Sequence, residues 1–191
     1  MFSLRSVLLF SFIIFFAFQQ NVISQNKFQI VPGKSVGAIK IGDCKDSVLK
    51  IIKSKYTEKT FQEEKKSFAD SDLTNLPQFV LGFDNAIVFD DFPVYQIFKV
   101  CFKKDSLNYI MLTSYGFGSE KTVAKYKTQK HIGFYVDQKK VVKAYGEPEK
   151  IIALKNEIDY IYWSKGIEFV FEDEQVAVIY IFKPIENPIK K

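Results

Sequence analysis

Residues 158–182, IDYIYWSKGIEFVFEDEQVAVIYIF, alternate aromatic and aliphatic side chains with other residues in three runs. Alternation with a period of two predicts β-strands, so this segment predicts three strands in an antiparallel meander. Lys165-Gly166 suits a two-residue hairpin turn, and a second turn is expected at Glu174-Gln175. These turns determine which residues lie opposite one another in the sheet.

The pairing set by these turns makes one face of the sheet continuously apolar. Phe169 on the middle strand lies opposite Tyr162 on one side and Tyr180 on the other. We expect this face to form the core beneath a layer of helices. Its residues are Ile158, Tyr160, Tyr162, Ile167, Phe169, Phe171, Val176, Val178, Tyr180 and Phe182.

A helix with well-marked ends precedes the meander. Asp137 is placed to cap its first turn, and residues 138–145 carry apolar side chains along one side. Gly146 is the expected left-handed residue after the helix, and Pro148 prevents its continuation. The segment therefore predicts a short helix packed on the sheet.

The first half of the chain repeats this plan. Asp43 is the cap candidate for a helix whose inner face comprises Cys44, Val48, Ile51, Ile52 and Tyr56. Strand-like runs follow at 78–83, 86–90, 94–102 and 107–115. The last two predict a hairpin whose inner face carries Phe98, Val100, Phe102, Leu107, Tyr109 and Met111. An offset of about 93 residues aligns the two helices, which leads to the hypothesis of an internal duplication.

The predicted fold class is α+β, with short helices packed on one face of antiparallel β-meander sheets. Two tandem helix-plus-sheet halves are expected within it. The predicted boundaries are 1–25 for a signal peptide, 26–115 for the first half, 116–130 for a connection, 131–185 for the second half and 186–191 for a C-terminal tail.

The first 25 residues predict export. Arg5 precedes an apolar run at 7–18, and polar residues and the small residue Ser24 follow it. A spanning helix needs roughly 20 apolar residues, which is longer than this run. We therefore expect cleavage after Ser24 or Gln25, no stable membrane span afterwards, and a periplasmic or extracellular location.

The charge does not predict a nucleic-acid partner, although the formal net charge is +5. No arginine follows Arg5, and every other basic residue is a lysine. Base and phosphate recognition depends strongly on the bidentate arginine fork, which lysine cannot reproduce. We expect no nucleic-acid binding.

The residues give little sign of catalytic, metal or cofactor chemistry. His131 is the only histidine, and no Gly-x-Ser-x-Gly motif is present. One histidine and two distant cysteines cannot form a zinc site, so no metal and no cofactor is expected. The carboxylates near Asp84 and Glu172 suit solvated turns, although a glycosidase pair stays open. Pairing of Cys44 with Cys101 is also left open.

The outer face of the second-half sheet is the predicted partner-binding surface. It combines apolar side chains, acidic residues and the only tryptophan, which is typical of interaction surfaces. The alternative is that the first-half sheet or residues 57–76 cover this face as a second core layer. The predicted site residues are Ile161, Trp163, Glu168, Val170, Glu172, Ile179 and Ile181.

Several short motifs carry a resemblance to known proteins. They are HIGFYVD (131–137), the pair VV (141–142), the exit YGEP (145–148) and the late turn FEDEQV (171–176), with AIKIGD (38–43) as a looser match. The pattern resembles the small outer-membrane assembly lipoproteins of the BamE (SmpA/OmlA) type and the tandem repeats of beta-lactamase inhibitory protein. This resemblance implies a helix-over-sheet module that binds other proteins without catalysis.

The expected function is therefore an exported, non-enzymatic protein-binding module of the cell envelope or the secreted fraction. It would act as an assembly factor or an inhibitor through a sheet face, with another envelope or secreted protein as its partner. A small exported carboxylate-dependent hydrolase and a carrier of a hydrophobic ligand remain alternatives. A buried carboxylate of raised pKa in a cleft would favour the hydrolase.

Overall fold

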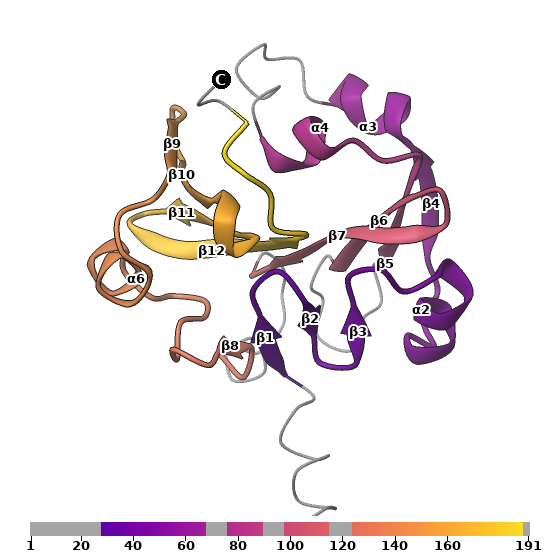
Figure 1. The fold of residues 1–191 in the computed structure, drawn as a ribbon, viewed down its shortest axis with the longest axis horizontal. Helices are drawn as coiled ribbons and strands as arrows, with labels where there is room; N and C mark the ends of the chain where they lie inside the picture. The colour runs from indigo at the N-terminus through magenta and orange to yellow at the C-terminus, as the bar shows by residue number, and fades with distance from the viewer. Residues whose placement is uncertain (1–27, 68–75, 90–97, 115–123, 189–191) are drawn as a thin grey trace, which may run out of the picture.

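The computed structural model describes residues 28–67, 76–89, 98–114 and 124–188. An eight-stranded antiparallel sheet forms its centre (Figure 1). In spatial order its strands are β4 (Thr57–Thr60), β5 (Asn85–Phe89), β6 (Phe98–Lys103), β7 (Ser106–Thr113), β12 (Gln175–Phe182), β11 (Ile167–Glu172), β10 (Ile158–Tyr162) and β9 (Lys150–Ala153). Each half of the chain contributes a four-strand meander, and the two meanders join where β7 pairs with β12.

One face of this sheet, here called the first face, packs against two helices and a small sheet. The helices are α2 (Lys45–Ile51) and α6 (Gln138–Tyr145). The small sheet comprises β1 (Gln29–Val31), β2 (Ser35–Val36), β3 (Ile39–Lys40) and β8 (Lys127–Thr128), with β1 and β8 parallel. Val48 and Val141, one from each helix, are fully buried in the same hydrophobic cluster, so both halves share one core.

The opposite face, here called the second face, is covered as well. Helices α3 (Phe61–Ser67) and α4 (Pro77–Leu81) lie on the other side of the sheet from α2 and the small sheet (Figure 1). Phe61 and Leu76 pack there against a second hydrophobic cluster that includes Ile161 and Trp163. The sheet therefore separates two core layers, with α2, α6 and the small sheet on the first face and α3 and α4 on the second.

The prediction is more accurate for α6 than for α2, because only α6 has the side-chain cap that was predicted. Asp137 accepts a hydrogen bond from the Lys140 backbone N–H at 2.8 Å, and α6 begins and ends as predicted. In α2 the N-cap is Cys44, which makes no side-chain capping bond, and the helix ends at Ile51. Cys44, Ile51 and Tyr56 are exposed, so their predicted inward orientation is wrong.

A β-bulge alters the predicted register of β11 and β12. The hairpin turns at Asp173 and Glu174 rather than at the predicted Glu174-Gln175. The pairing then shifts by one residue between Val170 and Phe171, so Phe169 lies opposite Ile179 rather than Tyr180. A shift of one residue reverses the faces of a strand. Ile179 and Ile181 therefore belong to the first face, whereas Val178, Tyr180 and Phe182 lie on the second.

The turn between β10 and β11 has a smaller effect. A 3-10 turn (Trp163–Lys165) ending in Gly166 shifts the register by two residues, so Tyr162 lies opposite Ile167 instead of Phe169. A two-residue shift leaves each side chain on its predicted face.

A second bulge changes the predicted hairpin of β6 and β7. It lies between Cys101 and Phe102, and it moves Tyr109 and Met111 to the second face beside Cys101. The hairpin turns at Lys104 and Asp105, both with positive φ.

The α+β fold class with antiparallel meanders and short helices is confirmed. Within the described part of the chain, no helix has the length and apolar character needed to cross a membrane. The predicted signal peptide and most of the predicted connection at 116–130 lie outside the described residues. Cys44 and Cys101 are both free thiols.

Candidate functional site

The second face holds almost all the buried polar chemistry of the described residues. Seven polar or charged side chains are buried in the described part of the chain, and six of them lie on the second face. The exception, Thr128, lies in the small sheet. We call the six the polar layer: Glu64, Gln78, Lys99, Thr113, Asp159 and Glu168. The first face, by contrast, is packed with apolar and aromatic side chains.

The predicted partner surface does not form one exposed patch. Ile161, Trp163 and Val170 are buried in the second cluster, with Glu168 beside them. Helix α3 of the alternative covering segment, residues 57–76, packs beside β4 and β5 of the first half (Figure 1). Ile179 and Ile181 are buried on the first face, and Glu172 is half-buried at the end of β11. The predicted exposure of this patch is therefore wrong.

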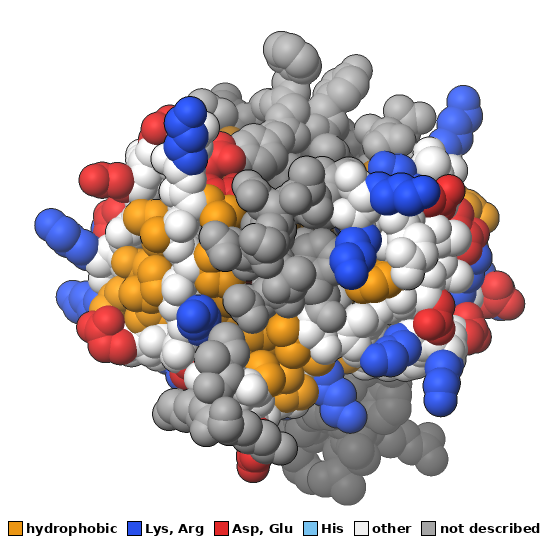
Figure 2. All heavy atoms as spheres, turned by 90° about the horizontal axis from the view of Figure 1, so that it is seen from above, with side chains coloured by type: hydrophobic (Ala, Val, Ile, Leu, Met, Phe, Trp, Pro, Cys, Tyr) orange, Lys and Arg blue, Asp and Glu red, His pale blue; other side chains and the backbone are white. Residues whose placement is uncertain are grey.

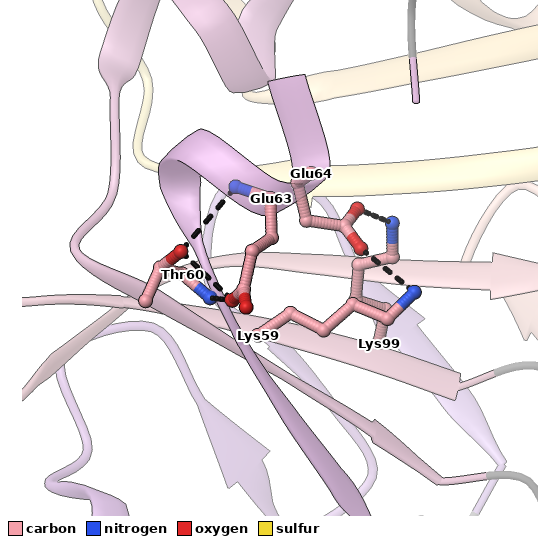
Figure 3. Close-up of polar contacts among 5 residues, drawn as sticks. All are labelled: Lys59, Thr60, Glu63, Glu64 and Lys99. Atoms are coloured by element: carbon pink, nitrogen blue, oxygen red, sulfur yellow. Dashed lines mark hydrogen bonds and ion pairs between the residues drawn. The ribbon is translucent and has the colours of Figure 1, made fainter. Parts of the chain in front are cut away.

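A capping box fixes the first turn of helix α3, and the residue after it connects the helix to the sheet. Thr60 and Glu63 form a capping box, in which Glu63 Oε2 accepts from the Thr60 N–H at 2.7 Å and Thr60 Oγ1 accepts from the Glu63 N–H at 3.3 Å. The next residue, Glu64, points toward the sheet, where Lys99 Nζ donates to it at 2.5 Å (Figure 3). Lys59 approaches the same carboxylate at 3.5 Å.

Two carboxylates of the polar layer lie on neighbouring strands. Asp159 on β10 faces Val170, and Glu168 lies two residues before Val170 on β11, so the carboxylates are diagonal neighbours. Their side chains are 1% and 0% exposed. Burial, reinforced by the charge of Glu157, raises the pKa of Asp159 to about 7. Burial and the charges of Asp159 and Glu157 raise the pKa of Glu168 well above its usual range.

Hydrogen-bond donors without partners accompany these carboxylates. The Tyr109 hydroxyl and Trp163 Nε1 are buried and unpaired, as are Asp159 Oδ1 and both carboxylate oxygens of Glu168. Tyr109 contacts the ring of Tyr180 with 5.1 Å between centroids, and Tyr180 lies opposite Glu168. Burial raises the pKa of Tyr109, and the charges of Tyr180, Glu168 and Asp159 add to this effect.

Glu168 lies on the predicted outer face of the sheet, but it belongs to a buried cluster with Asp159, which the sequence pattern did not indicate. Alternation alone cannot distinguish a solvated face from a second core layer. One signal in the sequence could have indicated this cluster. Both carboxylates have apolar neighbours, Ile161 and Val170, on the same face of the sheet.

The edges of the eight-stranded sheet differ in character. On β9, Ile151 is 50% exposed, the highest value among the exposed large hydrophobic side chains. On β4, all four residues are exposed and polar, and Glu58 forms an ion pair with Lys45 at 2.7 Å. Figure 2 views the second face from above and shows apolar side chains gathered over the β9–β12 half, with charged groups around them.

An open hollow of about 590 Å³ lies at the end of α2, away from the polar layer. Tyr56, 45% exposed, stands at this end and contacts the Phe89 ring at 5.9 Å. The residues lining the hollow are Leu49, Ile52, Lys53, Ser54, Lys55 and Tyr56.

No three histidine, cysteine, aspartate or glutamate side chains in the described segments converge to hold a metal ion. His131 is exposed and has a φ of 60° in a turn. No protein-family model matches the chain, and neither curated proteins nor solved structures provide a match.

Proposed function

We propose that the chain is an exported, non-enzymatic binding module whose partner is another protein of the cell envelope or the secreted fraction. The signal-peptide pattern of residues 1–25 supports export. Both faces of the large sheet are covered by core layers. A partner that contacts the sheet itself must therefore reach it at an edge.

The observation that carries the proposal is the exposed Ile151 on the outermost strand β9. Strand β9 pairs with β10 on one side, and no described strand pairs with its other side. An edge strand presents unpaired backbone N–H and C=O groups, and proteins usually protect such edges with charges, prolines or bulges. Strand β9 has one charged residue, Lys150, and beside it the exposed apolar side chain of Ile151. The partner expected here is an extended segment that adds a strand to the sheet.

The other edge supports this choice by contrast. Strand β4 carries Thr57, Glu58, Lys59 and Thr60, with charged side chains at its centre. This composition is typical of an edge protected against strand addition. Each edge strand is the first strand of a four-strand meander. Of these two equivalent strands, β9 carries an exposed apolar side chain and β4 does not.

Capture experiments with matched edge variants test the proposal. Mature protein (residues 26–191), an Ile151→Lys variant on β9 and a Thr57→Lys variant on β4 are compared as bait for envelope and secreted fractions. We expect a protein retained by the mature protein and by Thr57→Lys but lost with Ile151→Lys, and binding must be reproduced with both components purified. Equal retention by all three baits contradicts binding at β9.

A carboxylate-dependent hydrolase is the second candidate, and Asp159 is the observation that favours it. A carboxyl group with a pKa of about 7 suits general acid–base catalysis near neutral pH. However, Asp159 is only 1% exposed, so a substrate would reach it only after rearrangement of the polar layer. Hydrolysis of chromogenic glycosides or esters that is lost in Asp159→Asn would support this candidate over the binding module.

A further inference from the structure

The open hollow at the end of α2, here called the α2 hollow, has no role in the proposed function. Its volume is about 590 Å³, and small-ligand sites typically measure roughly 300–1,000 Å³. All six lining residues lie within residues 49–56, the segment that leads from α2 to β4. The chemistry of the hollow is therefore determined by a short stretch of chain.

The buried part of the lining is apolar. Ile52 is 3% exposed and belongs to the first-face core, and the half-buried Leu49 packs against the same core. The Tyr56 side chain is 45% exposed, and its ring contacts the buried Phe89 ring at 5.9 Å between centroids. An alkyl chain that lies on Leu49, Ile52 and Tyr56 would remove apolar surface from water on both partners.

The charged part of the lining is entirely positive. Lys53 and Lys55 line the hollow and are exposed, and Lys50 is exposed near the end of α2. Among the described residues none of these three lysines forms an ion pair, and Glu58 is already bound to Lys45 at 2.7 Å. The C-terminal end of a helix carries about half a negative charge, which three lysines outweigh.

The hydrogen-bonding groups of the lining suit an anionic head with several acceptor oxygens. A lysine ammonium group donates and cannot accept, and the hydroxyls of Ser54 and Tyr56 are able to donate as well. A carboxylate accepts charge-assisted hydrogen bonds from lysines, which are stronger than bonds between neutral groups. The same lysines would repel an organic cation, and they would contribute nothing to the binding of an uncharged chain.

We propose that the α2 hollow binds a single-chain anionic amphiphile of the alkyl-carboxylate class. The carboxylate accepts hydrogen bonds from Lys53 and Lys55, and the alkyl chain lies against Leu49, Ile52 and Tyr56. Because the hollow is open, it covers only part of the ligand, and binding is weak. For a ten-carbon carboxylate we expect a dissociation constant of about 1 mM.

This site is separate from the edge proposed for a protein partner. Helix α2 and strand β9 lie on opposite sides of the molecule (Figure 1). A ligand in the α2 hollow therefore leaves β9 accessible, and neither site depends on the other.

Titration of isotope-labelled mature protein with sodium decanoate, followed by amide chemical shifts, tests the proposal. We expect the largest shifts at residues 49–56. The double variant Lys53→Gln, Lys55→Gln should bind decanoate at least about fivefold more weakly, because two exposed charge pairs are lost.

A matched double variant on α6 controls for the overall loss of charge. Lys139→Gln, Lys143→Gln removes the same charge from two exposed lysines of the helix that corresponds to α2 in the second half. This variant should bind decanoate as the mature protein does. Thermal unfolding first establishes that both double variants fold.

Four results would overturn the proposal. The first is the absence of shifts at residues 49–56 with decanoate at about tenfold the expected dissociation constant. The second is equal binding of decyltrimethylammonium, which would show that the lysines select no charge. The third is equal binding of propionate, which would show that the chain makes no contact.

The fourth result concerns the source of the anionic group. Binding to vesicles of phosphatidylcholine and phosphatidylglycerol that is lost in Lys53→Gln, Lys55→Gln and is not displaced by decanoate would assign the lysines to a membrane surface instead. None of these four results bears on the β9 edge, so the proposed function is tested separately.

Discussion

Glu64 of α3 and Lys99 of β6 form an ion pair 2.5 Å long inside the second core layer, with side chains only 6% and 10% exposed (Figure 3). The pair joins a helix to the centre of the first-half meander across 35 residues of sequence. It is a buried polar connection between α3 and the second face. Several of the measurements below depend on this layer.

Breaking the Glu64–Lys99 pair from one side should destabilise the protein strongly. Lys99→Met leaves a buried carboxylate without its main partner, and the expected loss in the free energy of unfolding is about 3–5 kcal/mol. The double variant Glu64→Leu, Lys99→Met should regain most of that loss, because two apolar groups leave no buried charge. Urea unfolding measures both values.

The surface pair Lys45–Glu58 is the matched control, with side chains 27% and 39% exposed. Glu58→Gln should cost less than about 1 kcal/mol. A cost for Lys99→Met as small as that of Glu58→Gln would contradict the anchoring role of the buried pair.

The stability of the protein should fall as the pH rises toward neutrality. The pKa of Asp159 is about 7 in the folded protein, above its ordinary value of 3.8, because of burial and the charge of Glu157. The folded state therefore binds this proton more tightly than the unfolded state. The stabilisation is fully present below about pH 4 and is lost as the pH rises through about 7.

Thermal unfolding of the mature protein between pH 4 and pH 8 measures this dependence. Asp159→Asn should flatten the curve and raise the melting temperature most at pH 8, since the amide carries no charge to bury. An unchanged slope in Asp159→Asn would assign the pH dependence to other groups with raised pKa values, such as Glu157 and Glu168.

The cap of α6 should contribute measurably to stability. Asp137 accepts the Lys140 N–H at 2.8 Å, and Asp137→Ala should lower the free energy of unfolding by about 1 kcal/mol. Asp46, an exposed acidic residue in the first turn of α2, is the comparison. Asp46→Ala loses only its interaction with the helix dipole, worth about 0.3–1 kcal/mol. Chemical denaturation should rank Asp137→Ala as the more damaging change.

Two glycines with positive φ should respond differently to alanine. At Gly166, a Cβ would lie 2.2 Å from the Phe182 carbonyl oxygen and 2.7 Å from Gly33 Cα. At Gly146, a Cβ would meet nothing within 4 Å. Gly146 has φ 81° and ψ −174°, a conformation found almost only in glycine, so Gly146→Ala should cost about 1–3 kcal/mol. Gly166→Ala adds the clash of its Cβ to the strain of the left-handed conformation and should cost at least about 1 kcal/mol more. Equal costs would show that the turn at Gly166 relaxes freely.

Local signals in the sequence predicted helix α6 well and the strand faces less well. Asp137 and Gly146 bracket α6 with interactions made within a few residues, which a sequence displays directly. The register of β12 depends on a bulge beside Val170, and no neighbouring glycine or proline marks that bulge. Strand alternation therefore predicted Phe169 correctly and reversed Ile179 and Ile181.

The buried polar layer could not be predicted for a related reason. Glu168 was expected on an exposed sheet face, and a charged side chain in an alternating strand usually faces water. The burial of Asp159 and Glu168 depends on the second hydrophobic cluster, which gathers residues from both halves of the chain and includes Leu76, Tyr109 and Phe182. Long-range packing, rather than local propensity, determined the environment of these carboxylates.

Hydrogen–deuterium exchange of the mature chain, alone and with its purified captured partner, tests most directly whether β9 is the binding edge. We predict that the β9 amides (Lys150–Ala153) exchange rapidly in the free protein and become protected in the complex, while the β4 amides (Thr57–Thr60) are unchanged. Protection confined to β4 or to the α2 hollow, with β9 unchanged, would contradict strand addition at β9.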